Sequence, residues 1–157
     1  MSASHQYSES NTSGETITDG ITNLNFGSND SVNLSTSTYP ITVSEASFEK
    51  YIRSKFGSTF TTISNMKFWK SAGTYVVGES ITAAANVAFA TPSQTANADS
   101  AIPTAVGSAL AIQSAAGTST ITTAGYTKYI RLQLQTTGST PAGAVNQKTF
   151  TFQYDEV

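Results

Sequence analysis

Few residues of this sequence could do chemistry. Its 157 residues include one histidine, no cysteine, eight lysines and arginines, and ten aspartates and glutamates. The histidine, His5, lies in a polar N-terminal stretch that we expect to be loose, so we predict neither a Ser-His-Asp arrangement nor an imidazole metal site. The lack of cysteine excludes disulfides, thiolate zinc sites and thiol nucleophiles. Enzyme classes that need these groups are therefore not expected.

Pairs of carboxylates could still act as acid and base. Five acidic residues that the sandwich portion offers belong to no recognisable motif, and we expect them on the solvated surface: Glu49, Glu79, Asp99, Asp155 and Glu156. The stretch NADS at 97–100 offers oxygen ligands for calcium but only one carboxylate, which is too few. Neither GxGxxG nor GxxxxGK[ST] occurs. The sequence thus predicts no catalytic, metal or cofactor site, and we expect a non-enzymatic protein.

The composition indicates an all-β protein. Ser and Thr occupy 47 of the 157 positions, and charged residues make up only 11%, against roughly 25% in an average soluble domain. Threonine favours pleated surfaces, and glycine and asparagine favour the turns between strands. The net charge of −2 excludes the basic surface that sequence-independent nucleic-acid binding needs. No stretch approaches the roughly 20 apolar residues that cross a bilayer, so no membrane partner is expected.

The clearest strands are residues 126–135 and 148–155, where apolar and polar side chains alternate. A period of two places one face of each strand on the core. The polar loop between them contains Gly138, Pro141 and Gly143, which predicts an antiparallel hairpin. Gly125 and Tyr126, where the strand at 126–135 begins, could form a corner whose tyrosine hydroxyl bonds to an earlier turn.

Shorter patterns complete the sheet prediction. Residues 47–56 fit a spacing of four as well as two, so a helix remains an alternative there, but their aromatic and β-branched content favours a strand. Residues 60–69 predict a strand with a bulge at 63–65 and with Met66 and Phe68 inward. Further strands are expected at 21–26, 31–34, 39–43, 81–89 and 109–112. About seven to nine short strands predict an antiparallel β-sandwich of immunoglobulin-like or jelly-roll type.

The domain prediction is a flexible acidic and polar arm over residues 1–20, followed by a single β-sandwich domain over 21–157. The arm is aperiodic and cannot bury enough apolar area to order alone. Residues 1–49 carry six acidic residues and no basic one, whereas residues 50–148 carry all eight basic residues against two acidic ones. The acidic third is therefore predicted to lie on a basic surface, either of its own domain or of a neighbouring copy.

Three segments are expected to reach neighbouring molecules: the arm, a long loop at 90–104 and the loop at 136–147. With the aromatic residues that could line a platform, they give the candidate interface: Tyr7, Glu9, Glu15, Trp69, Tyr75, Pro92, Asp99 and Pro141. The small outward residues of 81–89 indicate that this face of the strand is covered.

The stretches SNMKFWKSAG, GESITAAANVAFATP and GYTKYIRLQLQTTGSTPAGAVNQKTFTFQYDEV resemble small β-sandwich proteins encoded among the virion genes of tailed bacteriophages. The resemblance spans roughly residues 47–157. It implies a structural virion component that decorates or cements a capsid, or completes the neck or tail. The expected partners are the major capsid protein or other virion proteins and further copies of this chain. The protein would be made in the host cytoplasm and located in the virion.

A second function remains open. Trp69, Tyr75, Tyr129 and Tyr51 could form a platform for sugars, as in sandwich-fold binding modules. This predicts a carbohydrate-binding or receptor-binding module instead of a shell protein.

Overall fold

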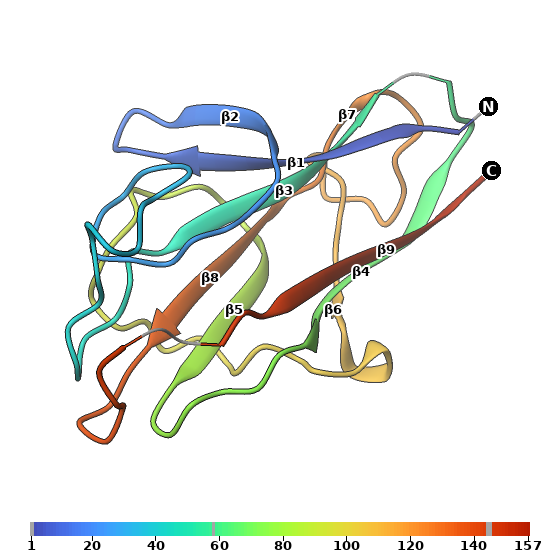
Figure 1. Ribbon diagram of the computed structural model, residues 1–157. Helices are drawn as coiled ribbons and strands as arrows, with labels where there is room; N and C mark the ends of the chain where they lie inside the picture. Colours follow the sequence, from blue (N-terminus) through green and yellow to red (C-terminus); the bar gives the residue numbers. More distant parts are fainter. Residues whose placement is uncertain (1, 58, 144–145) are drawn as a thin grey trace.

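Two antiparallel sheets packed face to face make up the protein (Figure 1). The computed structural model describes residues 2–57, 59–143 and 146–157. Within them lie nine strands and one short 3₁₀ helix: β1 (Ser4–Asn11), β2 (Thr16–Ile21), β3 (Lys50–Gly57), β4 (Ile63–Ala72), β5 (Ser80–Val87), η1 (Val106–Ser108), β6 (Leu110–Ala111), β7 (Gly125–Tyr126), β8 (Tyr129–Gln135) and β9 (Thr149–Glu156). The predicted all-β sandwich is confirmed.

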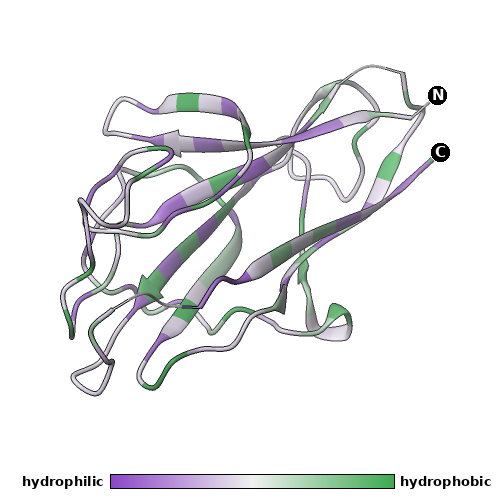
Figure 2. Ribbon diagram, viewed as in Figure 1, coloured by the Kyte–Doolittle hydropathy of each residue, from purple (hydrophilic) through white to green (hydrophobic). Residues whose placement is uncertain are grey.

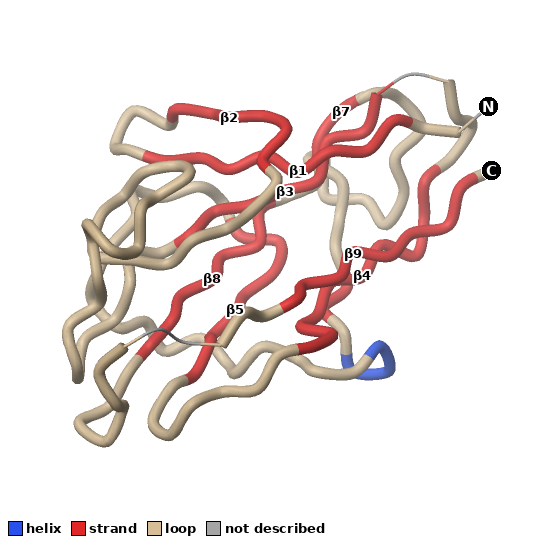
Figure 3. Tube along the Cα trace, in the orientation of Figure 1, coloured by secondary structure: helices blue, strands red, loops and turns tan. Residues whose placement is uncertain are grey.

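The two sheets differ in width. The larger sheet has the order β2-β1-β3-β8-β5, with β7 pairing on β3, and the smaller sheet has the order β6-β4-β9. The pairs within both sheets are antiparallel. Figure 3 shows long connections gathered at the end of the sandwich away from the two termini. The smaller sheet therefore covers only part of the larger one.

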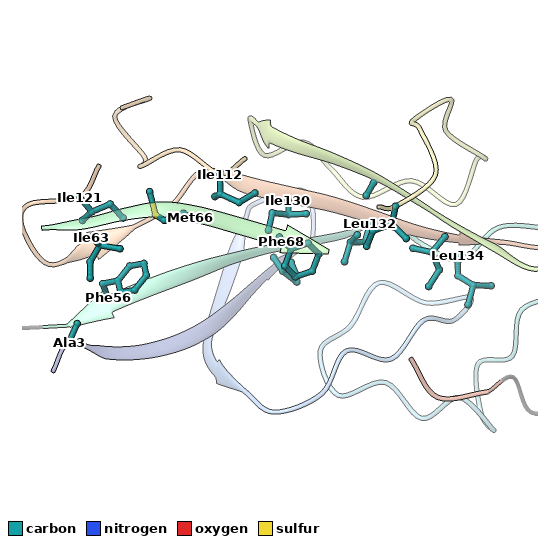
Figure 4. Packing of buried hydrophobic residues seen from close by; sticks show 14 residues of the cluster. Ala3, Phe56, Ile63, Met66, Phe68, Ile112, Ile121, Ile130, Leu132 and Leu134 are labelled. Atoms are coloured by element: carbon teal, nitrogen blue, oxygen red, sulfur yellow. The ribbon is translucent and has the colours of Figure 1, made fainter. Parts of the chain in front are cut away.

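The core lies between the sheets and follows the alternation of the strands (Figure 2). Ile130, Leu132 and Leu134 of β8 point inward and are buried, facing Met66 and Phe68 of β4 (Figure 4). Fourteen buried apolar residues form this cluster. Its burial, at roughly 25 cal/mol per Å² of apolar area, is the main favourable term in folding.

Several predicted strands are confirmed. Residues 47–56 contain strand β3 and no helix. The bulge of β4 lies between Ser64 and Lys67, where Asn65 has a φ of 52°, and Met66 and Phe68 are inward. The strand expected at 81–89 is β5, and that at 109–112 is the two-residue β6.

The predicted hairpin of 126–135 and 148–155 is wrong. Strand β8 pairs with β3 and β5 in the larger sheet, whereas β9 pairs with β4 in the smaller one. The loop between them crosses from one sheet to the other. Alternation identifies a strand and its buried face, but it does not identify the partner strand.

The predicted flexible arm over residues 1–20 is also wrong. Strand β1 lies inside the larger sheet between β2 and β3, with Ser8 and Ser10 fully buried. The strands expected at 31–34 and 39–43 do not form, and of 21–26 only Ile21 belongs to a strand. This segment is instead held by bonds across its loops, such as Ser28 N to Tyr39 O at 3.1 Å.

Part of the acidic N-terminal third lies on basic residues of its own domain, which is one of the two alternatives predicted. Glu9 accepts a hydrogen bond from the Lys50 ammonium at 2.8 Å, and both side chains are 1% exposed. Asp19 pairs with Lys55 at the surface. Polar and charged contacts therefore hold a strand that apolar burial alone would not.

Candidate functional site

The first residues of β1, Ser4 to Gln6, pair with β3 but not with β2, and this part of β1 lies beside the edge of β9 along a seam where the two sheets do not pair. At one end the seam is closed. The backbone N–H of Ala3 donates to Glu156 Oε1 at 2.6 Å, and the ring of His5 stacks on Phe152 with a centroid distance of 5.4 Å. Phe56 meets Tyr154 edge to face at 4.9 Å. Aromatic packing thus seals this end.

His5 lies within this packing, contrary to the expectation of a loose tail. Its Nε2 is 3.0 Å from Ser54 Oγ, and burial lowers the pKa of the imidazole from its ordinary value of 6.5. It is therefore a half-buried, neutral side chain at neutral pH.

At its other end the seam opens into a groove between the sheets, with a volume of about 1020 Å³. Its walls come from the segment after β2 and from the start of β9, and its floor from the buried core. The principal apolar lining residues are Leu24, Phe26, Ile41, Phe68, Leu134 and Phe150. We call this cavity the seam groove. Its size is at the upper end of the range for ligand pockets, roughly 300–1,000 Å³.

The seam groove carries almost no charge. Lys148 is the one charged side chain among its described lining residues. The Lys148 ammonium contacts the Glu79 carboxylate, and their side chains are 5% and 0% exposed. A second cation, Lys70, and the same Lys148 lie over the ring of Tyr75 at 4.8 and 5.4 Å. Because the charge of Lys148 is already paired, the groove fits neutral, apolar groups.

Strand β9 forms one edge of the groove. Phe150 stacks on Phe68 with a centroid distance of 5.8 Å and meets Phe26 edge to face at 6.5 Å. Further along, the backbone of Phe152 forms a hydrogen bond with the Tyr7 hydroxyl; burial raises the pKa of Tyr7, and this bond lowers it in part. Tyr7 thus caps the edge of β9 at the point where the seam closes.

Only some residues of the predicted interface lie at the seam groove. Tyr7 and Pro141 line it, and Tyr75 lies beside its paired lysine. The remaining predicted residues lie elsewhere: Glu9, Glu15, Trp69, Pro92 and Asp99. Of these, Glu9 is buried against Lys50, and Pro92 is buried as well. These two cannot contact a partner without a rearrangement.

The other three predicted residues, Glu15, Asp99 and Trp69, have neighbours within the domain. Glu15 accepts a hydrogen bond from the Tyr129 hydroxyl, and burial together with this bond raises the pKa of Tyr129 to about 12. Asp99 binds the Arg131 guanidinium through both oxygens at 2.7 and 2.8 Å. Trp69 is half-buried on the outer face of the smaller sheet, opposite Thr151.

The Arg131 pair helps to fasten the loop at 90–104 onto the outer face of the larger sheet. The bonds to Asp99 raise the pKa of the arginine, and Gln133 donates to the backbone oxygen of Thr95 at 3.0 Å. In β5, Thr82 is buried and bonds Asn97 at 2.8 Å. The predicted cover of the small outward face is therefore confirmed at Thr82, whereas Ala84 and Asn86 are half-buried and Ala88 is exposed. The expectation of solvated carboxylates is wrong for Glu49, Glu79 and Asp99, since each is paired.

Two smaller predictions concern the surface. The Tyr126 hydroxyl donates to both oxygens of Asp19 at 3.1 Å, which ties it to strand β2 and not to a turn. Among the described residues no group of three His, Cys, Asp or Glu side chains could hold a metal ion.

Sequence reasoning missed the groove because it assigned Leu24, Phe26 and Ile41 to strands. The available signal was that these apolar residues do not alternate over more than a few positions, while Asn23 and Asn25 interrupt them. Such residues are typical of loops that cover an open edge of a core.

No protein-family model matches the chain, and no curated protein or solved structure is significantly similar to it. In the part of the chain that the structure describes, no helix has the length and apolar character needed to span a membrane.

Proposed function

We propose that this protein is a non-enzymatic structural component of a tailed-bacteriophage virion, of the capsid decoration or cement type. The observation that carries the proposal is the seam groove: an apolar cavity of about 1020 Å³ beside a strand edge, on a small β-sandwich. An apolar groove rimmed by polar residues is a common binding place for a partner segment or a ligand. The sequence resemblance supplies the setting, a virion, and the groove supplies a means of attachment.

The electrostatics of the groove fit such a role. Attachment through neutral, apolar contacts is little weakened by salt, whereas surface ion pairs are screened. Many copies on one particle would also make a modest contact effective through multivalency. We therefore expect attachment to the shell to persist at high ionic strength.

Quantitative mass spectrometry of purified particles tests the proposal. Many copies per particle, retained after washing in about 1 M salt where the Debye length is ~3 Å, would support a decoration protein. About six or twelve copies would place it instead in the neck or tail, where rings of this symmetry occur. Complete absence from washed particles would refute the virion role.

One observation favours the second candidate, a carbohydrate-binding or receptor-binding module. Trp69 lies on the outer face of the smaller sheet opposite Thr151, whose hydroxyl donates to Ser71 Oγ at 2.7 Å. An indole beside hydroxyls suits a sugar ring. Glycan-array binding that is lost in a folded Trp69→Ala variant, but kept in Tyr75→Phe, would favour this role; silence across the array would count against it.

A further inference from the structure

The smaller sheet ends at β9 although the larger sheet continues. In the described residues β9 pairs only with β4, while the larger sheet extends five strands across to β2. The seam groove lies beside the start of β9, at Thr149 and Phe150, next to the edge where a fourth strand of the smaller sheet would pair. The sandwich therefore has the space of a missing strand.

The backbone of β9 presents hydrogen-bonding groups to this space. In an antiparallel pair the N–H and C=O of one residue point to the same side, and successive residues alternate. Phe152 and Phe150 pair with Phe68 and Lys70 in regular register. The N–H of Lys70, which lies opposite Phe150, donates to Pro103 O at 2.9 Å instead of to β9, so the backbone groups of Phe150 face away from β4. No described residue donates to, or accepts from, that side of Phe150.

We propose that β9 binds an extended, uncharged segment of a partner protein as a fourth strand, whose alternate apolar side chains fill the seam groove. The inference rests on the proposed function in one respect: the partner would be another virion protein. Strand addition of this kind takes its affinity from main-chain bonds and its specificity from pockets for every second side chain.

The lining determines the chemistry of the segment. Leu24, Ile41 and Phe150 offer apolar contacts, and the ammonium of Lys148 is already paired with Glu79. A charged side chain pointing inward would find no partner and would lose its hydration. The outward side chains of the segment would be solvated, so an alternation of apolar and neutral polar residues fits best.

The closed end of the seam limits the length. Tyr7 and His5 occupy the edge of β9 at Phe152, and Thr149 and Thr151 face β4, so a new strand can form main-chain bonds only with Phe150. A segment of roughly four to six residues, a common strand length, would be enough. Within the described residues both terminal strands already pair inside this domain, which favours a segment from another chain.

A synthetic eight-residue peptide of alternating valine and threonine, with acetylated and amidated ends, serves as the probe. Calorimetry measures its affinity for the wild-type protein and for two matched variants. Val43→Lys places a charge at the groove, where Val43 is 41% exposed. Val77→Lys places the same charge on a valine that is 72% exposed and outside the groove. We expect at least about tenfold weaker binding for Val43→Lys and no change for Val77→Lys.

Hydrogen exchange tests the mode of binding. The Phe150 amide should exchange at least about tenfold more slowly when the peptide binds, while the Thr151 amide, which faces β4, should not change. No binding of the peptide, equal binding to both variants, or an unchanged Phe150 amide would each overturn strand addition. Palmitate that displaces the peptide without protecting Phe150 would instead indicate a site for apolar small molecules.

The oligomeric state tests whether a second copy of this chain, instead of a partner protein, occupies the groove. A dimer in which Phe150 is protected without peptide would show that a second copy fills the groove, and it would overturn the proposed partner. These measurements use the isolated protein, so their failure is distinct from absence of the protein from particles.

Discussion

At both ends of the seam between β1 and β9, backbone groups of β9 face away from β4 and, in the part of the chain that the structure describes, have no strand to pair with. The two ends differ in what lies against these groups. At the closed end, Tyr7 bonds the backbone of Phe152, and His5 covers its ring. At the open end, Phe150 has a similar inward ring but no described group on the free side of its backbone. An aromatic side chain, Tyr7, thus takes the place of a neighbouring strand at Phe152. No described side chain takes this place at Phe150, two residues earlier, and this leaves room for a ligand there.

The largest expected effect is a difference in stability between the two ends. Phe56→Ala at the closed end should lower the free energy of unfolding by about 3–5 kcal/mol, because Phe56 is 1% exposed and its loss leaves a cavity. Phe150→Ala should cost less than about 2 kcal/mol, since the ring is half-buried beside existing space. Urea unfolding of both variants measures this, and equal losses would show that the open end is packed as tightly as the closed end.

A second prediction concerns the charged pair further along β1. Lys50→Ala should destabilise the fold by about 3–5 kcal/mol, because Glu9 would remain buried without its partner. Its matched control, Lys55→Ala, removes a lysine from a surface pair with Asp19 and should cost much less, because exposed ion pairs contribute little to stability. Similar unfolding midpoints for the two variants would contradict a buried ionic contact at this position.

The closed end should also respond to pH through His5. Burial lowers the pKa of His5 below 6.5 in the folded state, so the unfolded chain binds the proton more readily. Stability is then complete above this value and decreases as the pH falls below it, with the slope set by the difference in bound protons. Urea midpoints from about pH 7 to about pH 5 should fall in the wild type and stay flatter in His5→Phe; parallel curves would argue against a buried neutral imidazole.

The smallest expected effect is at the open end. Val43→Lys and Val77→Lys should each change the free energy of unfolding by less than about 0.5 kcal/mol, because both valines are exposed. Thermal unfolding measures this. A large loss for Val43→Lys alone would mean that Val43 is part of the core and that the groove is narrower than the structure shows.

Much of the strand content was predictable from alternation. In β5 and β8 the alternate apolar residues Ile81 and Ala83, and Ile130, Leu132 and Leu134, are buried in the core, and that alternation is present in the sequence itself. The pairing was not predictable, because β8 and β9 have apolar faces that suit either sheet. The two were wrongly joined for the simple reason that they are neighbours in sequence.

Strand β1 shows why polar segments are hard to interpret. Its buried residues include Ser8, Glu9 and Ser10, which give no apolar alternation. Their burial depends on partners that lie far away in sequence, such as Lys50 for Glu9 and Tyr129 for Ser10. The charge asymmetry of the chain was the one usable signal, and it correctly placed acidic residues against basic ones.

The hydrogen bond between Ala3 and Glu156 brings the first and last strands to one corner of the molecule, away from the loops at the open end of the seam (Figure 1). A fluorophore, affinity tag or fused protein joined at either terminus would therefore project from that corner. Immobilising the domain by such a handle would leave the groove accessible to whatever is offered to it.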